Sequence, residues 1–469
     1  MKRYLLLIGL VLAGAVASAQ QPFSKGRLKV SDNHRYLVHS DGTPFFWLGD
    51  TAWELFHRLT KQEAEQYLKH RAKQGFTVVQ AVALAELDGL NTPNAEGAKP
   101  LVNNDPAQPN EAYFKHMDYV IDKAAENGIA IALLPTWGDK VFKSTWGKGP
   151  EIFNVGNAAA YGEWIGKRYK NRDNVIWVLG GDRTPRADSD DVKVWQLMAA
   201  GIVKGTGGDD QALLSFHPQP NALNMGGSSN WFHQDTWLDF NMLQNGHCRD
   251  EINYDKIAFV YDRKPAKPVL DAEPIYEDHP VCFNVTDLGT SNAYDVRKYA
   301  YLDLFAGAFG HTYGCHDIWQ MNGGGREPVN GPHMTWNEAL DLPGAKQMTL
   351  VRRLMESRPL LDRIPDQSLI EENNNGPATR IQATRGKDYA FVYTATGQPV
   401  TVHAGKISGK EFVAHWYDPR KGEVTKIGTF PNQGKHQFKA PSSGYGKDWV
   451  LILDDTEKKY GFDFASAVK

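Results

Sequence analysis

Cysteine is scarce in this chain of 469 residues, which contains only Cys248, Cys282 and Cys315. Three cysteines allow at most one intramolecular bridge, so a small fold held together by several disulfides is excluded. Their spacing matches no zinc-ligand pattern. The fold must therefore rest on a hydrophobic core, which a chain of this length can supply.

The chain also lacks an excess of charge of either sign. Fifty-two Lys and Arg residues stand against 55 Asp and Glu residues, which gives a formal net charge of −3, and no basic run is present. We therefore expect neither a nucleic-acid partner nor an anionic membrane surface. No H-E-x-x-H motif and no G-x-S-x-G elbow occur, and the glycines at 323–325 follow no phosphate-loop signature. We expect no metal, no cofactor and a monomeric chain.

Hydrophobic runs of membrane length are missing, and the one apolar run that stands out is at the N-terminus. Lys2 and Arg3 precede an apolar stretch from Leu5 to Val16, and residues 17–19 form an A-x-A cleavage signal. About a dozen apolar residues are too few to cross a bilayer. The pattern predicts that residues 1–19 are a signal peptide and that the protein is exported to the periplasm or cell surface of a bacterium.

Buried strands alternate with amphipathic helices between residues 20 and 358. After a β-hairpin at 27–39, apolar strands are predicted at 45–49, 77–82, 129–134, 175–179, 213–216, 240–243, 268–271 and 311–319. Helices are predicted at 60–75, 111–127, 158–170, 190–203, 293–309 and 344–355. Non-alternating apolar strands separated by helices indicate a parallel sheet, and eight of them indicate an α/β fold of the (β/α)8 TIM-barrel type.

The pattern changes after residue 358. Residues 359–377 are predicted to be a linker, and residues 378–469 contain short alternating strands with no intervening helix. This spacing is typical of an all-β sandwich.

Barrel enzymes carry their functional residues at the carboxyl ends of the strands. Acids, amides, imidazoles and aromatic rings gather at these positions, which is the mixture needed to bind a polyol ring. The predicted substrate-binding residues are Asp50, Trp53, Gln80, Trp137, Arg183, His217, Gln244, Tyr276, Glu277, Tyr313 and Trp319. His247 and His316 follow the sixth and eighth strands.

Two carboxylates are the predicted catalytic pair. Asp182 ends the fourth strand after two glycines, and Glu273 ends the seventh strand. Glycoside cleavage needs one carboxyl group to protonate the leaving oxygen and another to attack or to activate water. Acids on opposite arcs of a barrel can face each other across its mouth, and we expect the separation of about 5–5.5 Å that is typical of retaining enzymes.

Several of these residues have a second interpretation. Asp50 could cap a helix instead of binding sugar. Arg183 could bind the carboxylate of an acidic sugar in bidentate fashion, or it could belong to a buried ion pair. His217 is expected to donate hydrogen bonds to substrate or to neighbouring side chains and not to act as a base.

The segments 36–53, 174–182 and 273–277 resemble the apiosidase-like glycoside hydrolases, of the glycoside hydrolase family 140 type. The C-terminal part resembles the domain that often follows them and is labelled collagen-binding. The resemblance implies that Asp182 is the general acid/base and Glu273 the nucleophile of a retaining mechanism. It also implies, as substrate, the apiose–galacturonic acid linkage of the plant pectin rhamnogalacturonan II.

Two other functions remain open at this point. A related barrel could hydrolyse another plant or microbial glycoside, since loops change the substrate. A barrel of this type could also bind glycans without cleaving them, although the presence of both acids argues against that role.

Overall fold

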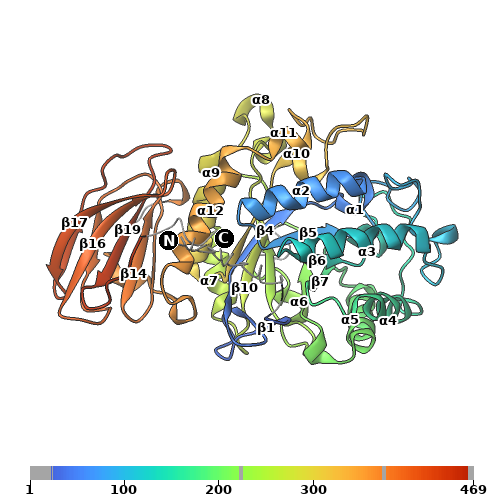
Figure 1. Cartoon of the computed structure of the whole chain (residues 1–469), viewed down its shortest axis with the longest axis horizontal. Coiled ribbons are helices and arrows are strands. Elements are labelled where there is room, and N and C mark those ends of the chain that lie inside the picture. The colour runs from blue at the N-terminus through green and yellow to red at the C-terminus, as the bar shows by residue number, and fades with distance from the viewer. Residues whose placement is uncertain (1–22, 24, 221–224, 372–375, 463–469) are drawn as a thin grey trace, which may run out of the picture.

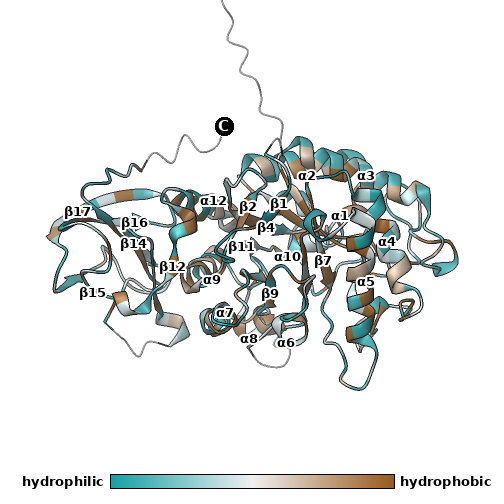
Figure 2. Cartoon of the chain, turned by 90° about the horizontal axis from the view of Figure 1, so that it is seen from below, coloured by the Kyte–Doolittle hydropathy of each residue, from teal (hydrophilic) through white to brown (hydrophobic). Residues whose placement is uncertain are grey.

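The computed structural model describes residues 23, 25–220, 225–371 and 376–462. The predicted signal peptide lies outside the described residues. The chain forms two domains that lie side by side along the long axis of the molecule (Figures 1 and 2). No helix in the described ranges is long and apolar enough to cross a membrane.

The first domain is a barrel of parallel strands, as predicted. Strands β11-β4-β5-β6-β7-β8 are hydrogen-bonded in this order, β9 pairs with β10, and the contacts of β8 with β9 and of β10 with β11 close the ring. The strands are β4 (Trp47–Thr51), β5 (Val78–Val82), β6 (Ala130–Leu134), β7 (Val175–Gly180), β8 (Leu214–His217), β9 (Asn241–Gln244), β10 (Val269–Glu273) and β11 (Gly310–Tyr313). Almost every strand residue is buried, which explains their unbroken apolar runs.

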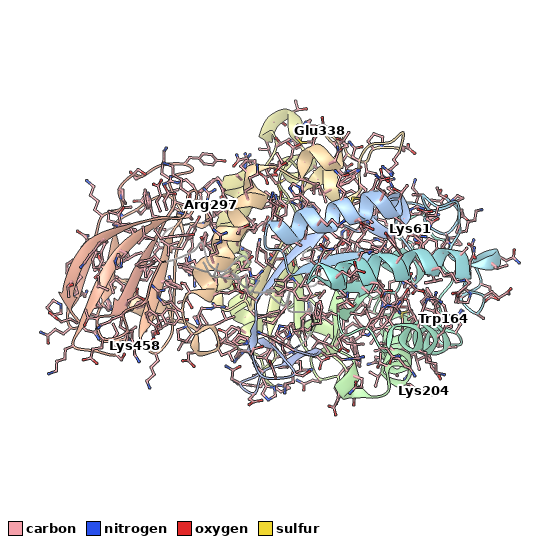
Figure 3. All side chains as sticks on the ribbon, viewed as in Figure 1. Lys61, Trp164, Lys204, Arg297, Glu338 and Lys458 are labelled. Atoms are coloured by element: carbon pink, nitrogen blue, oxygen red, sulfur yellow. A yellow bond between two sulfur atoms is a disulfide. The ribbon has the colours of Figure 1, made fainter. Side chains whose placement is uncertain are left out.

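Helices surround the strands. Thr60 and Glu63 form the predicted capping box at the start of α2. The longer helices are α2 (Lys61–Lys73), α3 (Glu111–Glu126), α4 (Ala158–Tyr169), α5 (Asp191–Thr206), α7 (Asn253–Tyr261), α9 (Ala293–Ala306) and α12 (Pro343–Glu356). Short helices are α1 (Leu55–Arg58), α6 (Ser229–Phe232), α8 (Val285–Leu288), α10 (His316–Trp319) and α11 (Trp336–Ala339). Figure 3 shows Lys61 and Lys204 on helices at the outer surface.

Two predictions within the barrel are wrong. The last strand ends at Tyr313, and His316–Trp319 is a helix. Between them a Cβ at Gly314 would lie 2.0 Å from the ring of Tyr276. Helix α7 was not predicted. Its nine residues have no side-chain cap to mark their start.

The N-terminal hairpin is part of a three-stranded antiparallel sheet. It consists of β1 (Leu28–Val30), β2 (Leu37–His39) and β3 (Pro44–Phe45). Leu37 and Phe45 pack into the same hydrophobic core as the barrel strands.

The second domain has two antiparallel sheets with a separate core. One sheet has the strand order β12-β13-β14-β19-β16-β17, and the other pairs β15 with β18. The strands are β12 (Ile364–Pro365), β13 (Ile381–Arg385), β14 (Tyr389–Thr394), β15 (Val400–His403), β16 (Glu411–Asp418), β17 (Glu423–Pro431), β18 (Lys435–Phe438) and β19 (Trp449–Asp455). The predicted linker contains β12, so the sandwich begins before residue 378, and β18 was not predicted.

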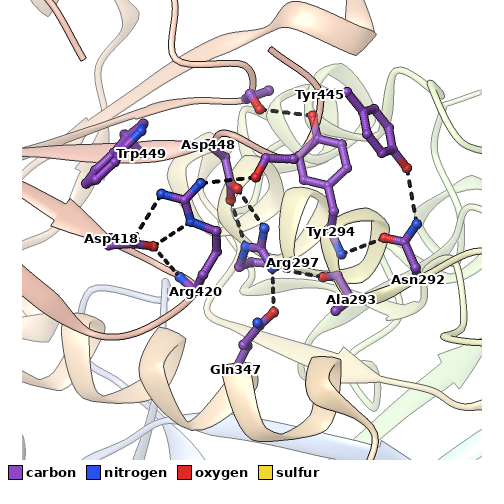
Figure 4. Close-up of polar contacts among 12 residues, drawn as sticks. Asn292, Ala293, Tyr294, Arg297, Gln347, Asp418, Arg420, Tyr445, Asp448 and Trp449 are labelled. Atoms are coloured by element: carbon purple, nitrogen blue, oxygen red, sulfur yellow. Dashed lines mark hydrogen bonds and ion pairs between the residues drawn. The ribbon is translucent and has the colours of Figure 1, made fainter. Parts of the chain in front are cut away.

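Helices α9 and α12 face the sandwich. Arg297 on α9 forms a bidentate ion pair with Asp448, with distances of 2.6 and 2.8 Å, and also donates to Gln347 on α12 (Figure 4). Tyr301 on α9 stacks on Tyr393 of β14, with 5.0 Å between ring centroids. A buried ion pair and stacked rings fix the sandwich against the barrel.

Candidate functional site

Asp182 and Glu273 lie close together at the mouth of the barrel. Gly181 separates Asp182 from the end of β7, and Glu273 is the last residue of β10. One carboxylate oxygen of each, together with one nitrogen of His217, lie within 4.8 Å of one another. The two strand ends therefore bring together the pair that the sequence singled out.

The backbone before Asp182 has an unusual conformation. Gly180, Gly181 and Asp182 have φ values of 88°, 112° and 49°. A Cβ on Gly180 would lie 2.3 Å from the carbonyl oxygen of His217, and a Cβ on Gly181 would lie 2.7 Å from the ring of Trp137. Glycine is thus required at both positions, and Asp is one of the few other residues that tolerate positive φ.

Two histidines contact Glu273. His217 Nε2 is 3.2 Å from Oε2 of Glu273, and His247 Nε2 is 3.4 Å from Oε1. His217 Nδ1 is also 3.8 Å from Oδ1 of Asp182. The side chains of Glu273, His217 and His247 are nearly or fully buried, so water screens their charges only weakly.

The environment sets opposite protonation states for the two acids. Burial, and then the negative charge of Glu273, raise the pKa of Asp182 to about 7. Burial also opposes ionisation of Glu273, but His217 and His247 outweigh it and lower the pKa of Glu273 to about 2. His217 is buried too, yet its contact with Glu273 raises its pKa. Below about pH 7 one carboxyl group is therefore mainly protonated and the other ionised, which is the arrangement that an acid and a nucleophile need.

Aromatic rings form one wall of the site. The rings of Trp53 and Trp137 are 5.2 Å apart, and Trp53 packs edge-on against His217 at the same distance. Trp53 follows β4 and Trp137 follows β6, the two strands on either side of β5, so nearby strand ends supply this wall.

Many polar atoms around this wall are buried but have no hydrogen-bond partner among the described residues. Buried polar groups are normally satisfied, so a cluster of unsatisfied ones indicates a place for a polar ligand. Apart from the paired His217 Nε2 and Glu273 Oε2, the atoms are Trp137 Nε1, Asp182 Oδ1, His217 Nδ1, Gln244 Oε1, Asn245 Oδ1, His247 Nδ1 and Tyr276 OH. The hydroxyl groups of a sugar can both donate to and accept from such a set.

Three predicted substrate-binding residues are instead engaged inside the protein. Asp50 accepts hydrogen bonds of 2.6 Å from Arg71 and from Tyr67, and no part of its side chain is exposed. Glu277 accepts from the hydroxyl of Tyr313 at 2.7 Å. These residues join strand ends to the surrounding helices, and their side chains have partners inside the protein.

Gln80 and Trp319 also have internal partners. The Nε2 atom of Gln80 donates to the carbonyl oxygen of Ala272 across the barrel at 2.9 Å, although its Oε1 atom has no partner among the described residues. Trp319 donates to His316 Nδ1 at 3.3 Å. Gln80 therefore lies beneath the catalytic pair, where it can support the strand that carries Glu273.

Arg183 braces a loop. Its Nε donates to the carbonyl oxygens of Phe142 and Lys143, and its Nη1 donates to that of Asp182. The guanidinium lies 4.8 Å from the ring centre of Trp146. These contacts are hydrogen bonds to backbone carbonyls and not an ion pair. The Nη2 atom is buried and has no hydrogen-bond partner among the described residues, so one donor of the guanidinium remains for a ligand.

Glu86 was not among the predicted site residues. It lies in the loop after β5, is partly exposed, and its pKa is raised well above the usual value by burial and by the charges of Asp182 and Asp139. Its place four residues beyond the end of β5 is the signal that could have identified it. The charge of Asp182 acts on Glu86, so the site contains a third carboxyl group beside the pair.

The cluster of Asp182, His217 and Glu273 has donor types that can also bind a divalent cation. The same atoms serve acid–base chemistry without an ion, because their mutual contacts already set their protonation states. Removal of metal ions by a chelator distinguishes the two uses.

Comparisons with known proteins agree with this geometry. Residues 31–362 match the family described as "Apiosidase-like, catalytic domain", and residues 364–454 match "Putative collagen-binding domain of a collagenase". The boundary between the two matches falls just before β12. No curated protein matches the chain.

Solved structures show the same architecture over nearly the whole chain. A protein described as "Glycoside hydrolase" is 37% identical, with a TM-score of 0.85, and the match covers 94% of this chain and 99% of that one. A glycoside hydrolase family 5 protein from Bacteroides vulgatus is 35% identical, with the same TM-score, and the match covers 94% and 96%. A third structure, at 17% identity and a TM-score of 0.65 over 92% and 82% of the two chains, shares the fold. With its two acids at the ends of β7 and β10, the chain belongs to the apiosidase-like family of glycoside hydrolases.

Proposed function

We propose that the protein is a retaining glycoside hydrolase in which Asp182 is the general acid/base and Glu273 the nucleophile. The observation that carries the proposal is the pair of adjacent carboxyl groups with pKa values of about 7 and about 2. Their approach to within 4.8 Å fits direct attack, because an inverting enzyme needs a wider gap to hold a water molecule.

In the first step the Glu273 carboxylate forms a bond to the anomeric carbon while the bond to the leaving oxygen breaks. Asp182 donates its proton to that oxygen, so the leaving group departs as an alcohol. In the second step the Asp182 carboxylate removes a proton from water, the water oxygen attacks the anomeric carbon, and the bond to Glu273 breaks. Both acids then return to their starting protonation states.

His217 and His247 assist by holding Glu273 ionised. When the nucleophile loses its negative charge on forming the covalent bond, the pKa of Asp182 falls because a neighbouring charge has gone. Asp182 thus becomes a better base at the moment when water must be activated. The short distance between the carboxyl groups of Asp182 and Glu273 therefore links formation of the covalent intermediate to its hydrolysis.

For the substrate we propose the apiose–galacturonic acid linkage of rhamnogalacturonan II in plant pectin. The support is the match to an apiosidase-like domain over most of the chain. We further propose that the protein is exported by a bacterium that degrades plant cell walls, since residues 1–19 have the pattern of a signal peptide.

A second candidate is a retaining hydrolase of a neutral glycoside. Two observations favour it: Arg183 already donates to backbone carbonyls, and Glu86 adds a carboxyl group near Asp182. A site lined by the three carboxyl groups of Asp182, Glu273 and Glu86 suits a neutral sugar better than a uronate. A barrel that only binds glycans is disfavoured by the opposite protonation states of the two acids.

Product analysis on a panel of pectic side-chain oligosaccharides and neutral plant glycosides tests the proposal. We expect wild-type protein to release apiose and the Glu273→Ala variant to release none. NMR of the first products should show the anomeric configuration of the substrate, whereas inverted product would overturn the double displacement. Release of a neutral sugar other than apiose would favour the second candidate.

A further inference from the structure

Phe283 is the most exposed large hydrophobic residue in the described part of the chain, with 64% of its surface accessible. It belongs to the loop that leads from β10 to α9, the same loop that begins just after Glu273. An aromatic ring left in water at the rim of a site calls for a functional explanation.

The imidazole ring of His247 contacts both the Phe283 ring and the proposed nucleophile, Glu273. The centroid of the Phe283 ring is 5.7 Å from that of His247, whose Nε2 atom is 3.4 Å from Glu273. The ring also packs edge-on against His279 at 4.9 Å, and the rings of His279 and His247 are 4.0 Å apart, so both imidazoles lie on the same side of Phe283. A molecule lying on Phe283 is therefore next to whatever is bound at Glu273.

The backbone holds this ring in a fixed position. Cys282 forms a disulfide with Cys248, and its N–H donates to the carbonyl oxygen of His247 at 2.9 Å. Both Cys282 and Phe283 have positive φ, 50° and 59°, a conformation that is costly for residues other than glycine. Such conformations persist where the surroundings enforce them and are concentrated at ligand-binding and catalytic sites.

The chemistry of the surroundings selects a sugar ring as the occupant. Phe283 offers an apolar face, and the nearby His247 Nδ1 and Tyr276 OH are buried polar atoms without partners among the described residues. The C–H groups on one face of a pyranose suit the ring, and its hydroxyl edge suits the polar atoms. We propose that Phe283 is a stacking platform for a sugar unit of the substrate next to the unit attacked by Glu273, an inference that rests on the proposed glycosidase function.

The test compares Phe283→Ala with Phe283→Trp and with Phe259→Ala. Phe259 is a matched control because it is also exposed, at 47%, but lies on α7 beside Arg263. For an oligosaccharide substrate we expect Phe283→Ala to raise KM about tenfold, the effect of losing about 50 Å² of apolar contact. On an aryl glycoside with a single sugar its kcat/KM should change less than about twofold. Phe283→Trp should keep the wild-type KM, and Phe259→Ala should not change it.

Binding measured in a Glu273→Gln background separates this inference from the proposed function. Calorimetry with the same oligosaccharides should show about tenfold weaker binding when Phe283→Ala is added. Equal affinity with and without Phe283→Ala overturns the platform even if wild-type protein hydrolyses the substrate. If the wild-type protein hydrolyses no glycoside but its binding of oligosaccharides depends on Phe283, the proposed function is overturned and the platform is supported.

A protein partner is the competing occupant, since Val285 and Leu288 beside Phe283 are also half exposed. Sedimentation of wild-type protein and Phe283→Ala addresses this. A wild-type dimer that Phe283→Ala converts to monomer would assign the ring to a contact between copies and overturn the sugar platform. An unchanged sedimentation coefficient supports the platform.

Discussion

The Nε2 atom of His217 lies 3.2 Å from Oε2 of Glu273, and both side chains are almost entirely removed from water. The contact stabilises the ionised carboxylate and the protonated imidazole together. Because His217 Nδ1 also faces Asp182, a change of charge on any one of these three residues is felt by the other two.

The pH profile of the reaction should reflect this coupling. Asp182 must be protonated to act as an acid, so kcat/KM should fall as the pH rises through about 7. The acidic limb should lie far lower, because the pKa of Glu273 is about 2. A rate profile between pH 3 and 9 checks the alkaline limb and should show no acidic limb in that range; because the groups are coupled, the apparent values belong to the pair.

Replacing Glu273 by Gln should lower the pKa of Asp182. The negative charge of Glu273 is the second cause of its elevation after burial, so removing the charge leaves the burial alone. An NMR titration of Asp182 in wild type and Glu273→Gln measures the shift. An unchanged pKa would show that the two carboxyl groups do not share a site.

Changing Asp182 to Ala should affect substrates according to their leaving groups. An activated aryl glycoside leaves without a proton, whereas the natural sugar leaving group needs one. We expect kcat to fall by about 10²- to 10⁴-fold on the natural linkage and much less on the aryl glycoside. Equal losses on both substrates would exclude Asp182 as the acid.

Arg183→Lys should have the same effect on acidic and neutral substrates. The guanidinium holds the loop at Phe142 and Lys143 by donating to two backbone carbonyls, which an ammonium group cannot reproduce with the same geometry. We expect kcat/KM to fall by a similar factor for uronate-containing and neutral oligosaccharides. A loss confined to uronate substrates would restore the interpretation in which Arg183 binds the acid sugar.

The Asp50–Arg71 pair should affect stability and not substrate affinity. Both side chains are fully buried, so Arg71→Met leaves an unpaired carboxylate in the interior and should lower the free energy of unfolding by about 3–5 kcal/mol. Lys69→Ala on the same helix removes an exposed ion pair with Glu65 and should cost less than about 1 kcal/mol. Chemical denaturation measures both, and a raised KM without loss of stability would return Asp50 to the binding site.

The barrel could be predicted from the sequence because its strands are buried on both faces and are therefore continuous apolar runs. The position of Asp182 and Glu273 at strand ends could be predicted because each lies within three residues of the end of such a run. The internal partners of Asp50 and Glu277 could not, because they are distant in sequence: Arg71 is 21 residues from Asp50, and Gly344, which donates its N–H to Glu277, is 67 residues away.

Other differences have local causes. The sequence did not show that the last strand stops at Tyr313, just before Gly314, which packs against the ring of Tyr276. Strand β12 contains only Ile364 and Pro365, too short a pattern to recognise, and it acquires its structure by pairing with β13. The pairing of Cys248 with Cys282 was left open by the sequence and depends on the loops after β9 and β10 meeting at the barrel mouth.

The two glycines before Asp182 constrain how this enzyme can evolve. Any side chain at Gly180 or Gly181 would strike His217 or Trp137, so single substitutions cannot reposition the acid without disturbing two other strand ends. New specificity must then arise elsewhere, in the long segments after strand ends such as residues 83–110 and 274–292. Sequence differences among relatives should therefore be concentrated in these segments, whereas the residues that cleave the glycosidic bond should be retained together.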